Sequence, residues 1–246
     1  MIDSGLLNVY KPSGLTSFQV VRVVREILQV KKVGHCGTLD PLAAGVLLVC
    51  FGKATKYTRF FLGEKKVYRA RMVLGIATAT GDKEGQIIRR QDLPPPAESQ
   101  IKEVFTRFLG EVEQVPPRYA ALKYQGKKYY EYARAGIDIP RPARKINIYH
   151  FDLLEYTFPY LTFTLGCSAG TYVRSLVEDV AAGLGSCGSL DNLVRESVGE
   201  FSVDKAIPWA EIKELSAEKL FRKATPLAEI LELINPDTDI EKSRLG

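Results

Sequence analysis

The chain has 246 residues, of which 46% are hydrophobic and 26% charged, a composition typical of a soluble globular protein with a well-filled core. No apolar run approaches the roughly 18 residues of a membrane-spanning helix, and the N-terminus lacks the basic and apolar regions of a secretory signal, so we expect a cytoplasmic protein. The net charge is a modest +5. Four scattered cysteines and only two histidines argue against a zinc site and predict reduced, buried thiols.

The first sixty residues predict a strand, a helix and a second, fully buried strand. Residues 5–11 are expected to form a strand, and Ser17 is expected to cap a helix that ends at Leu28. The apolar face of that helix is predicted to consist of Phe18, Val21, Val24 and Leu28. The continuous apolar run 46–51 predicts a buried strand.

The rest of the chain alternates helical and extended patterns without a regular βαβ rhythm. We expect helices over 54–62, 98–109, 127–134, 171–182 and 217–223. We expect strands over 66–74, 143–157 and 161–167, a loop over 76–85, and a short helix and strand over 190–201. The tail ends in polar residues that are expected to be mobile. This irregular order favours an α+β fold with a mixed sheet.

Between the first helix and the buried strand lies a glycine-rich stretch, residues 34–45, with a single carboxylate, Asp40. Pro41 disfavours the α region for Asp40 and is suited to start a short helix, Pro41–Ala44, with Asp40 as its N-cap. Capping alone explains an aspartate at this position, and a catalytic carboxylate is the alternative. The local pattern does not decide between the two.

Basic residues concentrate in two segments. Residues 53–71 hold seven basic residues against one acidic residue, and residues 118–145 hold eight against two, interleaved with five tyrosines. Basic side chains among aromatic ones suit a phosphate backbone with unstacked bases. A solvated surface explains the charge equally well.

A hydrolase nucleophile is excluded although residues 166–170 fit the pattern G-x-S-x-G. In that architecture the catalytic histidine follows the serine, whereas both histidines of this chain precede Ser168. The serine therefore lacks a base.

Several motifs occur together in one order along residues 5–208. They are Gly5 to Ser17, Gly34 to Leu47, Lys66-Val67-Tyr68, Ala77 to Asp82, Gln114-Val115-Pro116-Pro117, Tyr129 to Gly136, Ser168 to Leu176, Leu193-Val194-Arg195 and Gly199-Glu200-Phe201. In these motifs the chain closely resembles the TruB-type tRNA pseudouridine synthases. The resemblance implies the pseudouridine synthase fold, with a central mixed or antiparallel sheet flanked by helices and a catalytic cleft across it.

The resemblance also implies an activity, which is isomerisation of the T-loop uridine of tRNA (position 55) to pseudouridine without metal or organic cofactor. Asp40 matches the catalytic aspartate, Tyr68 the active-site tyrosine and Arg174 the arginine that pairs with the aspartate. Residues expected to bind or support the substrate are Lys11, His35, Tyr172 and Leu193. The implied partner is the T-arm of tRNA, bound by a monomer that needs no other protein.

These residue types suit the chemistry. The carboxylate of Asp40 acts as nucleophile or as base, and the sequence leaves both routes open. A guanidinium beside it favours the ionised form and orients it. The ring of Tyr68 can stack on a uracil that the enzyme extracts from the RNA stack, and its hydroxyl can help to remove the C5 proton. From the residues alone, Tyr68 also fits a half-buried strand tyrosine, and Arg174 a surface ion pair.

Some positions depart from the family pattern, notably Ala120 in place of serine and Val194 in place of a first arginine. We predict a catalytic domain over residues 1–208, with an RNA-contacting insertion at about 110–145. Residues 209–246 are predicted to be a short helical extension and not a complete PUA domain. Two alternatives remain, an RNA-guided synthase of the dyskerin type and a non-catalytic module that binds or folds tRNA.

Overall fold

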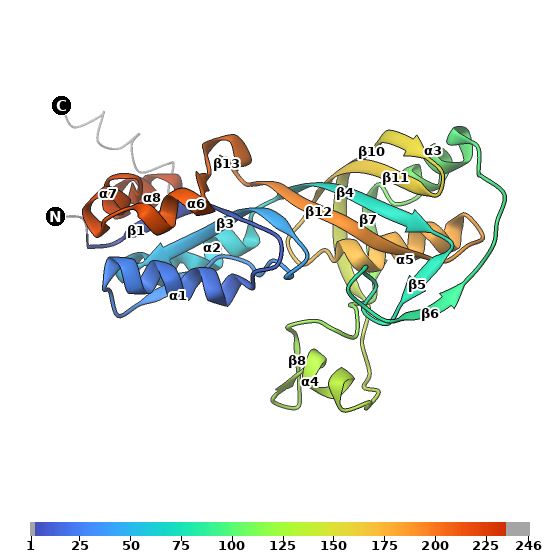
Figure 1. Cartoon of the computed structure of the whole chain (residues 1–246), viewed down its shortest axis with the longest axis horizontal. Coiled ribbons are helices and arrows are strands. Elements are labelled where there is room, and N and C mark those ends of the chain that lie inside the picture. Colours follow the sequence, from blue (N-terminus) through green and yellow to red (C-terminus); the bar gives the residue numbers. More distant parts are fainter. Residues whose placement is uncertain (1–2, 235–246) are drawn as a thin grey trace. The chain divides into compact units, whose positions relative to one another are not determined.

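The structure, a computed structural model, describes residues 3–234 and falls into two compact units. Unit 1 comprises residues 1–66 and 194–246, and unit 2 comprises residues 67–193. Each unit combines strands and helices (Figure 1). The polar end of the tail, predicted to be mobile, lies outside the described residues.

The strands of unit 1 form a mixed sheet, and one of them is covered on both faces. Its strands are β1 (Gly5–Lys11), β2 (Val33–His35), β3 (Ala44–Phe51), β13 (Phe201–Ser202), β14 (Ile207–Pro208), β15 (Thr225–Pro226) and the end of β12 (Gly188–Val198). The order is β14-β1-β3-β12; β1 pairs antiparallel with β3, whereas β12 pairs parallel with β3. Almost every residue of β3 is buried, as expected for a continuous apolar run covered on both faces.

Helices complete the core of unit 1. They are α1 (Ser17–Leu28), α2 (Thr58–Gly63), α6 (Trp209–Glu214), α7 (Ala217–Arg222) and α8 (Leu227–Ile234), with 3-10 turns at Gly52–Tyr57 and Val203–Lys205. The main core cluster comprises Leu6, Cys36, Val46, Leu48, Cys50, Ala54, Phe61, Val198 and Ile230. All four cysteines are free and buried, which confirms the burial predicted for them.

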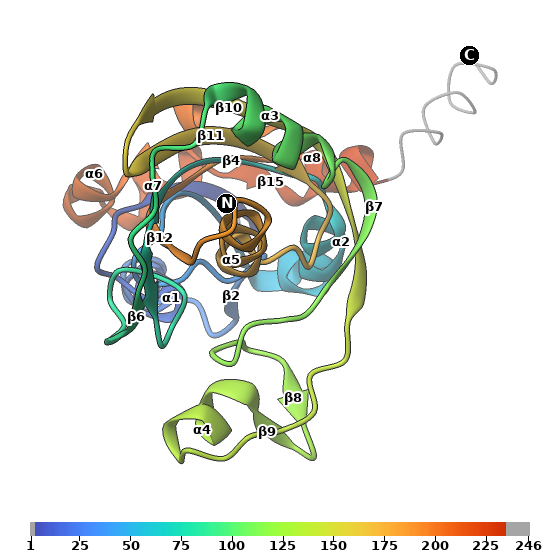
Figure 2. The ribbon, with the colours of Figure 1, turned by 90° about the vertical axis from the view of Figure 1, so that its right-hand side faces the viewer.

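Unit 2 combines a sheet, the helices packed with it and a projecting lobe. Its strands are β4 (Lys66–Leu74), β5 (Ile76–Thr78), β6 (Ile87–Arg90), β7 (Gly110–Gln114), β8 (Lys123–Tyr124), β9 (Lys127–Lys128), β10 (Arg144–Thr157) and β11 (Tyr160–Cys167). The order from β12 is β12-β4-β11-β10-β7, with β5–β6 and β8–β9 as separate hairpins. Its helices are α3 (Glu98–Thr106), α4 (Tyr129–Arg134) and α5 (Val173–Gly183). Figure 2 shows β8, β9 and α4 projecting from the rest of unit 2.

Most elements agree with the sequence, and the α+β class with a mixed sheet is confirmed. The start of the first helix differs, because Thr16 is the N-cap and forms a capping box with Gln19, while Ser17 is the first helical residue. Phe18 was wrongly placed on the apolar face; it is 65% exposed, and Val20 takes the buried position. At about 100° per residue, Phe18 lies roughly 100° from the centre of the face formed by Val20, Val21, Val24 and Leu28.

Three other local predictions were wrong. Residues 41–44 form no helix; the amide of Ala43 donates to the carbonyl of Asp40 at 3.0 Å in a single turn before β3. The expected loop over 76–85 begins with strand β5. Residues 190–198, expected to start as a helix, belong to strand β12, whose pairing with β3 overrides the local preference.

The domain prediction stays a prediction. The described part of the tail is helical, in α6, α7 and α8, and these helices belong to unit 1. None of the described helices is long and apolar enough to cross a membrane.

Candidate active site

The carboxylate Asp40 lies on a tight turn in unit 1, between β2 and β3, and its side chain is half-buried. We call residues 37–45 the Asp40 turn. Helix α1 fixes the turn, because the hydroxyl of Ser17 accepts from the amide of Leu39 at 2.8 Å and donates to its carbonyl at 3.0 Å. Ser17 thus supports the turn instead of capping α1.

Lys11 supports the same turn from β1. Its side chain is fully buried, and the ammonium donates to the carbonyls of Leu15 at 2.6 Å, Pro12 at 3.0 Å and Pro41 at 3.4 Å. The amide of Gly14 donates to the same Pro41 carbonyl at 2.8 Å. The ammonium of Lys11 therefore ties the loop after β1 to the residue that follows Asp40. A role for Lys11 in binding substrate stays a prediction.

Arg195 in β12 holds both ends of the Asp40 turn. Its side chain is 1% exposed; Nε donates to the carbonyl of Val46 at 2.7 Å and a terminal nitrogen donates to the carbonyl of Gly37 at 3.1 Å. Gly45 allows the close approach, since a Cβ at this position, where φ is +103°, would lie 2.2 Å from the carbonyl oxygen of Arg195. Asp40 consequently lies on a turn that is anchored on both sides.

His35 ends β2, directly before this turn, and is half-buried. Burial, and secondarily the charge of Arg195, lower the pKa of His35 below its ordinary value. Among the described residues, its buried Nδ1 has no hydrogen-bond partner. A neutral imidazole is therefore favoured near pH 7, and it is suited to hydrogen bonding or stacking rather than to attracting phosphate by charge.

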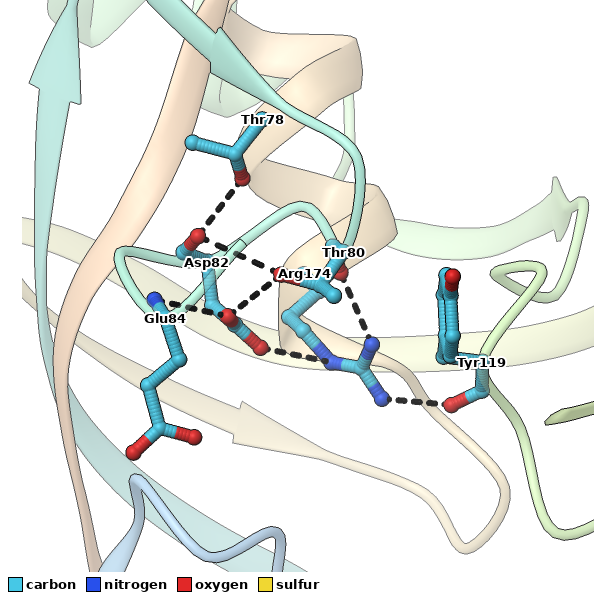
Figure 3. A network of polar contacts seen from close by, with 6 residues as sticks. All are labelled: Thr78, Thr80, Asp82, Glu84, Tyr119 and Arg174. Atoms are coloured by element: carbon cyan, nitrogen blue, oxygen red, sulfur yellow. Dashed lines mark hydrogen bonds and ion pairs between the residues drawn. The ribbon is translucent and has the colours of Figure 1, made fainter. Parts of the chain in front are cut away.

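In unit 2, Arg174 occupies the first turn of α5 and is 5% exposed, so the interpretation as a surface ion pair was wrong. Its Nε lies 3.8 Å from a carboxylate oxygen of Asp82, and its terminal nitrogens donate to the carbonyls of Thr80 and Tyr119, each at 2.9 Å. Figure 3 shows the guanidinium directed at all three partners. This arrangement fixes the plane of the guanidinium.

Asp82 is itself held by its loop. One carboxylate oxygen accepts from the hydroxyl of Thr80 at 2.6 Å and from the amide of Glu84 at 3.1 Å, and the Asp82 carbonyl accepts from the hydroxyl of Thr78 at 2.6 Å (Figure 3). The side chain of Asp82 is 8% exposed. The buried carboxylate of Asp82 and the buried guanidinium of Arg174 compensate one another's charge, so each replaces part of the water that the other has lost.

A second acidic group lies near Arg174. Burial, with the charge of Asp179, raises the pKa of Glu178, while Arg174 and Arg141 oppose the rise. Burial also raises the pKa of Asp179. These carboxyl groups follow Arg174 by about one turn of α5.

The predicted site residues divide between the units. Asp40, His35 and Lys11 belong to unit 1, whereas Tyr68, Tyr172, Arg174 and Leu193 belong to unit 2. Tyr68 in β4 is 8% exposed, Leu193 in β12 is 6% exposed, and Tyr172 is the N-cap of α5. The pairing of Asp40 with Arg174 stays a prediction. Among residues 3–234 there is no group of three or more histidine, cysteine or acidic side chains able to hold a metal ion.

Comparison with known proteins shows the family of this chain. Residues 25–173 match the family described as TruB family pseudouridylate synthase (N-terminal domain). The chain belongs to the TruB family of pseudouridylate synthases. The resemblance found in the sequence is therefore confirmed.

Relatives and solved structures extend the match over most of the chain. A protein of Clostridium tetani named tRNA pseudouridine synthase B is 41% identical over 95% of this chain and 81% of its own length. The protein of that name in Clostridium acetobutylicum is 45% identical over 97% of this chain and 82% of its own. A chain of a Cbf5–Nop10–Gar1 complex superimposes with a TM-score of 0.70 at 30% identity, over 92% of this chain and 61% of that one. The present chain thus spans about three fifths of that solved chain.

Sequence reasoning missed the roles of Asp82, Ser17, Arg195 and Gln114. All four stand in stretches that carry the family resemblance, which was the available signal. Ser17 bonds a residue 22 positions away and Arg195 bonds one 158 positions away, so spacing along the chain did not indicate these contacts.

Proposed function

We propose that this chain isomerises uridine 55 in the T-loop of tRNA to pseudouridine, with Asp40 as the catalytic carboxylate. Membership of the TruB family, together with relatives named tRNA pseudouridine synthase B over most of the chain, carries the proposal. Pseudouridine synthesis is an isomerisation. The N1–C1′ bond of the nucleotide breaks, a C5–C1′ bond forms, and the proton on C5 is lost while N1 gains one.

The anchored turn supports the role of Asp40. A carboxylate that must act at one atom of a bound nucleotide requires a fixed position, and contacts from Lys11, Ser17 and Arg195 to the surrounding backbone provide it. In the proposed mechanism, Arg174 keeps Asp40 ionised and oriented, and Tyr68 stacks on the uracil and assists loss of the C5 proton.

The substrate-binding roles follow the same proposal. His35 and Leu193 contact the extracted nucleotide, while Lys11 and Tyr172 support its binding. The projecting lobe of unit 2 carries Lys128 and Arg134 over the ring of Tyr130, at 5.4 and 5.3 Å from its centroid. Cations among aromatic rings suit RNA, which supports contacts of this lobe with the T-arm.

The proposal is tested with an unmodified tRNA transcript that contains 5-tritiated uridine and with the purified chain alone. Wild type releases tritium, and Asp40→Asn lowers the rate by at least about 100-fold because the amide is neither a base nor a nucleophile. The matched control is Asp92→Asn, which changes an exposed carboxylate. Equal rates for wild type and Asp40→Asn would remove Asp40 from the chemistry.

The same assay separates the alternatives. A transcript with cytidine at position 55 is expected to release only background tritium, which tests the target position. An RNA-guided enzyme, by comparison, would be silent with the purified chain and tRNA and active only with guide RNA and partner proteins. A chain that binds tRNA but releases no tritium under either condition would be a binding module. Size-exclusion chromatography tests the proposed monomer.

A further inference from the structure

Gln114 makes an unusual contact at the start of helix α5. It is the last residue of β7 and is 3% exposed. Its Nε2 donates to the carbonyl of Tyr172 at 3.0 Å, and its Oε1 accepts from the amide of Tyr172 at 2.8 Å. Both polar atoms of one buried side chain are thus directed at both backbone groups of one residue, 58 positions along the chain.

This contact replaces a local helix cap. Tyr172 is the N-cap of α5, and its side chain makes no capping hydrogen bond. In α1 the usual arrangement exists, because the side chain of Gln19 accepts from the amide of Thr16 at 2.7 Å. In α5 the equivalent position is Ser175, whose hydroxyl donates elsewhere, to the carbonyl of Val115 at 2.9 Å. Gln114 therefore caps α5 from a neighbouring strand.

The cap couples α5 to one short segment, residues 114–119, which we call the stem because it leads into the projecting lobe of unit 2. Three contacts from the first turn of α5 reach it. They are Gln114 with Tyr172, Ser175 with the carbonyl of Val115, and Arg174 with the carbonyl of Tyr119. Along the chain, Arg174 lies between Tyr172 and Ser175. The direction of its side chain therefore depends on how the first turn of α5 packs on the stem.

We propose that Gln114 is a positioning residue for the isomerisation, because it fixes the first turn of α5 on the stem and thereby aims the guanidinium of Arg174. The proposal rests on the proposed function. We expect Gln114 to make no contact with RNA, since it is 3% exposed and its side chain is directed at Tyr172. Its loss should therefore change turnover and leave tRNA affinity nearly unchanged.

The first test is Gln114→Met, which keeps the length of the side chain and removes both hydrogen bonds. We expect the single-turnover rate of pseudouridine formation to fall about tenfold, with the Kd for tRNA within about threefold of wild type. The matched control is Gln91→Met, because Gln91 donates to the carbonyl of Gly185 at 2.8 Å, beyond the opposite end of the same helix. A wild-type rate in Gln114→Met, or an equal loss in Gln91→Met, would overturn the proposal.

The second test is Gln114→Glu, which distinguishes positioning from general support. A protonated carboxyl offers one donor and one acceptor, as the amide does, whereas a carboxylate only accepts and faces the Tyr172 carbonyl unfavourably. The rate of Gln114→Glu relative to wild type should therefore rise as the pH falls from about 8 to about 5.5. If the ratio of the Gln114→Glu rate to the wild-type rate does not change with pH, where circular dichroism shows both proteins folded, the role of Gln114 is refuted. This second test suffices alone if Gln114→Met does not fold.

The two proposals fail in different ways. A wild-type chain that forms no pseudouridine in tRNA refutes the proposed function. An active wild type with an equally active Gln114→Met refutes only the role of Gln114.

Discussion

At the scale of single residues, Arg174 shows how the fold compensates a buried charge. Removing a guanidinium from water costs several kcal/mol unless partners replace the water. Asp82 supplies the opposite charge, and the carbonyls of Thr80 and Tyr119 take two further N–H groups. The three partners lie in three directions, which a planar guanidinium can satisfy at once.

This geometry predicts that Arg174→Lys loses function although it keeps the charge. A lysine ammonium cannot reach the three partners together, so about two charge-assisted hydrogen bonds are lost. We expect kcat for pseudouridine formation to fall about 100-fold, with tRNA affinity within a few fold of wild type. Single-turnover assays and filter binding measure the two quantities. Arg90→Lys, on exposed strand β6, is the control, and full activity of Arg174→Lys would contradict the role of the guanidinium.

Lys11 and Arg195 stabilise the backbone around the Asp40 turn. Both are fully buried cations that donate to backbone carbonyls around the Asp40 turn. Such cations rigidify irregular backbone that no helix or sheet can satisfy. After burial, the charge of Arg195 is the second cause of the lowered pKa of His35.

At the scale of elements, the pairing of β3 with β12 determines where the Asp40 turn ends. The strands pair in parallel at Ala44 and Gly45, opposite Val194 and Arg195. At Gly45 the backbones approach so closely that a Cβ would lie 2.2 Å from the carbonyl oxygen of Arg195. The glycine is therefore required by the space between the strands as well as by its positive φ.

We predict that Gly45→Ala lowers the free energy of unfolding by about 3 kcal/mol, through backbone strain and the forced separation of β3 from β12. Urea denaturation monitored by circular dichroism measures the change. Gly34→Ala is the matched control, since a Cβ at Gly34 would have no atom within 4 Å and its φ is ordinary. Equal stability of the two variants would contradict this prediction, because it would show that β3 and β12 accommodate the added Cβ without strain.

At the scale of the whole molecule, a carboxyl group whose pKa rises on folding makes stability depend on pH. Partial desolvation and the charge of Asp179 raise the pKa of Glu178 in the folded chain above its ordinary value of 4.5. The folded state then binds the proton more tightly than the unfolded state. The resulting stabilisation is complete below pH 4.5 and is lost as the pH rises through the higher pKa of the folded state.

Glu178→Gln should remove this dependence, because the amide resembles the protonated acid and does not titrate. The stability of wild type relative to Glu178→Gln is expected to decrease as the pH rises from about 4 to about 7. Urea titrations at several pH values measure the difference. Glu155→Gln, at an exposed position in β10, is the control. A difference that grows with pH, or the same trend in the control, would contradict this origin.

The family, the α+β class and most strands and helices could be predicted from the sequence, because these follow from local periodicity and from motifs that are contiguous in the chain. The buried run 46–51, the strand 66–74 and the pair 143–157 and 161–167 are examples. Even there, the N-cap of α1 is Thr16 and not Ser17, since a cap depends on which hydroxyl finds a free amide, and Phe18 lies outside the buried face.

The contacts that hold the site residues, by contrast, could be found only in the folded chain. Local preference favoured a helix at 41–44 and another near 190, but hydrogen bonds from distant residues and the pairing of β12 with β3 replaced both. Asp82 beside Arg174, Ser17 beneath Leu39 and Gln114 capping α5 join residues far apart in sequence. Such contacts depend on the complete fold, because a buried polar group takes whichever partner packing brings within hydrogen-bonding distance, and sequence spacing carries no record of that choice.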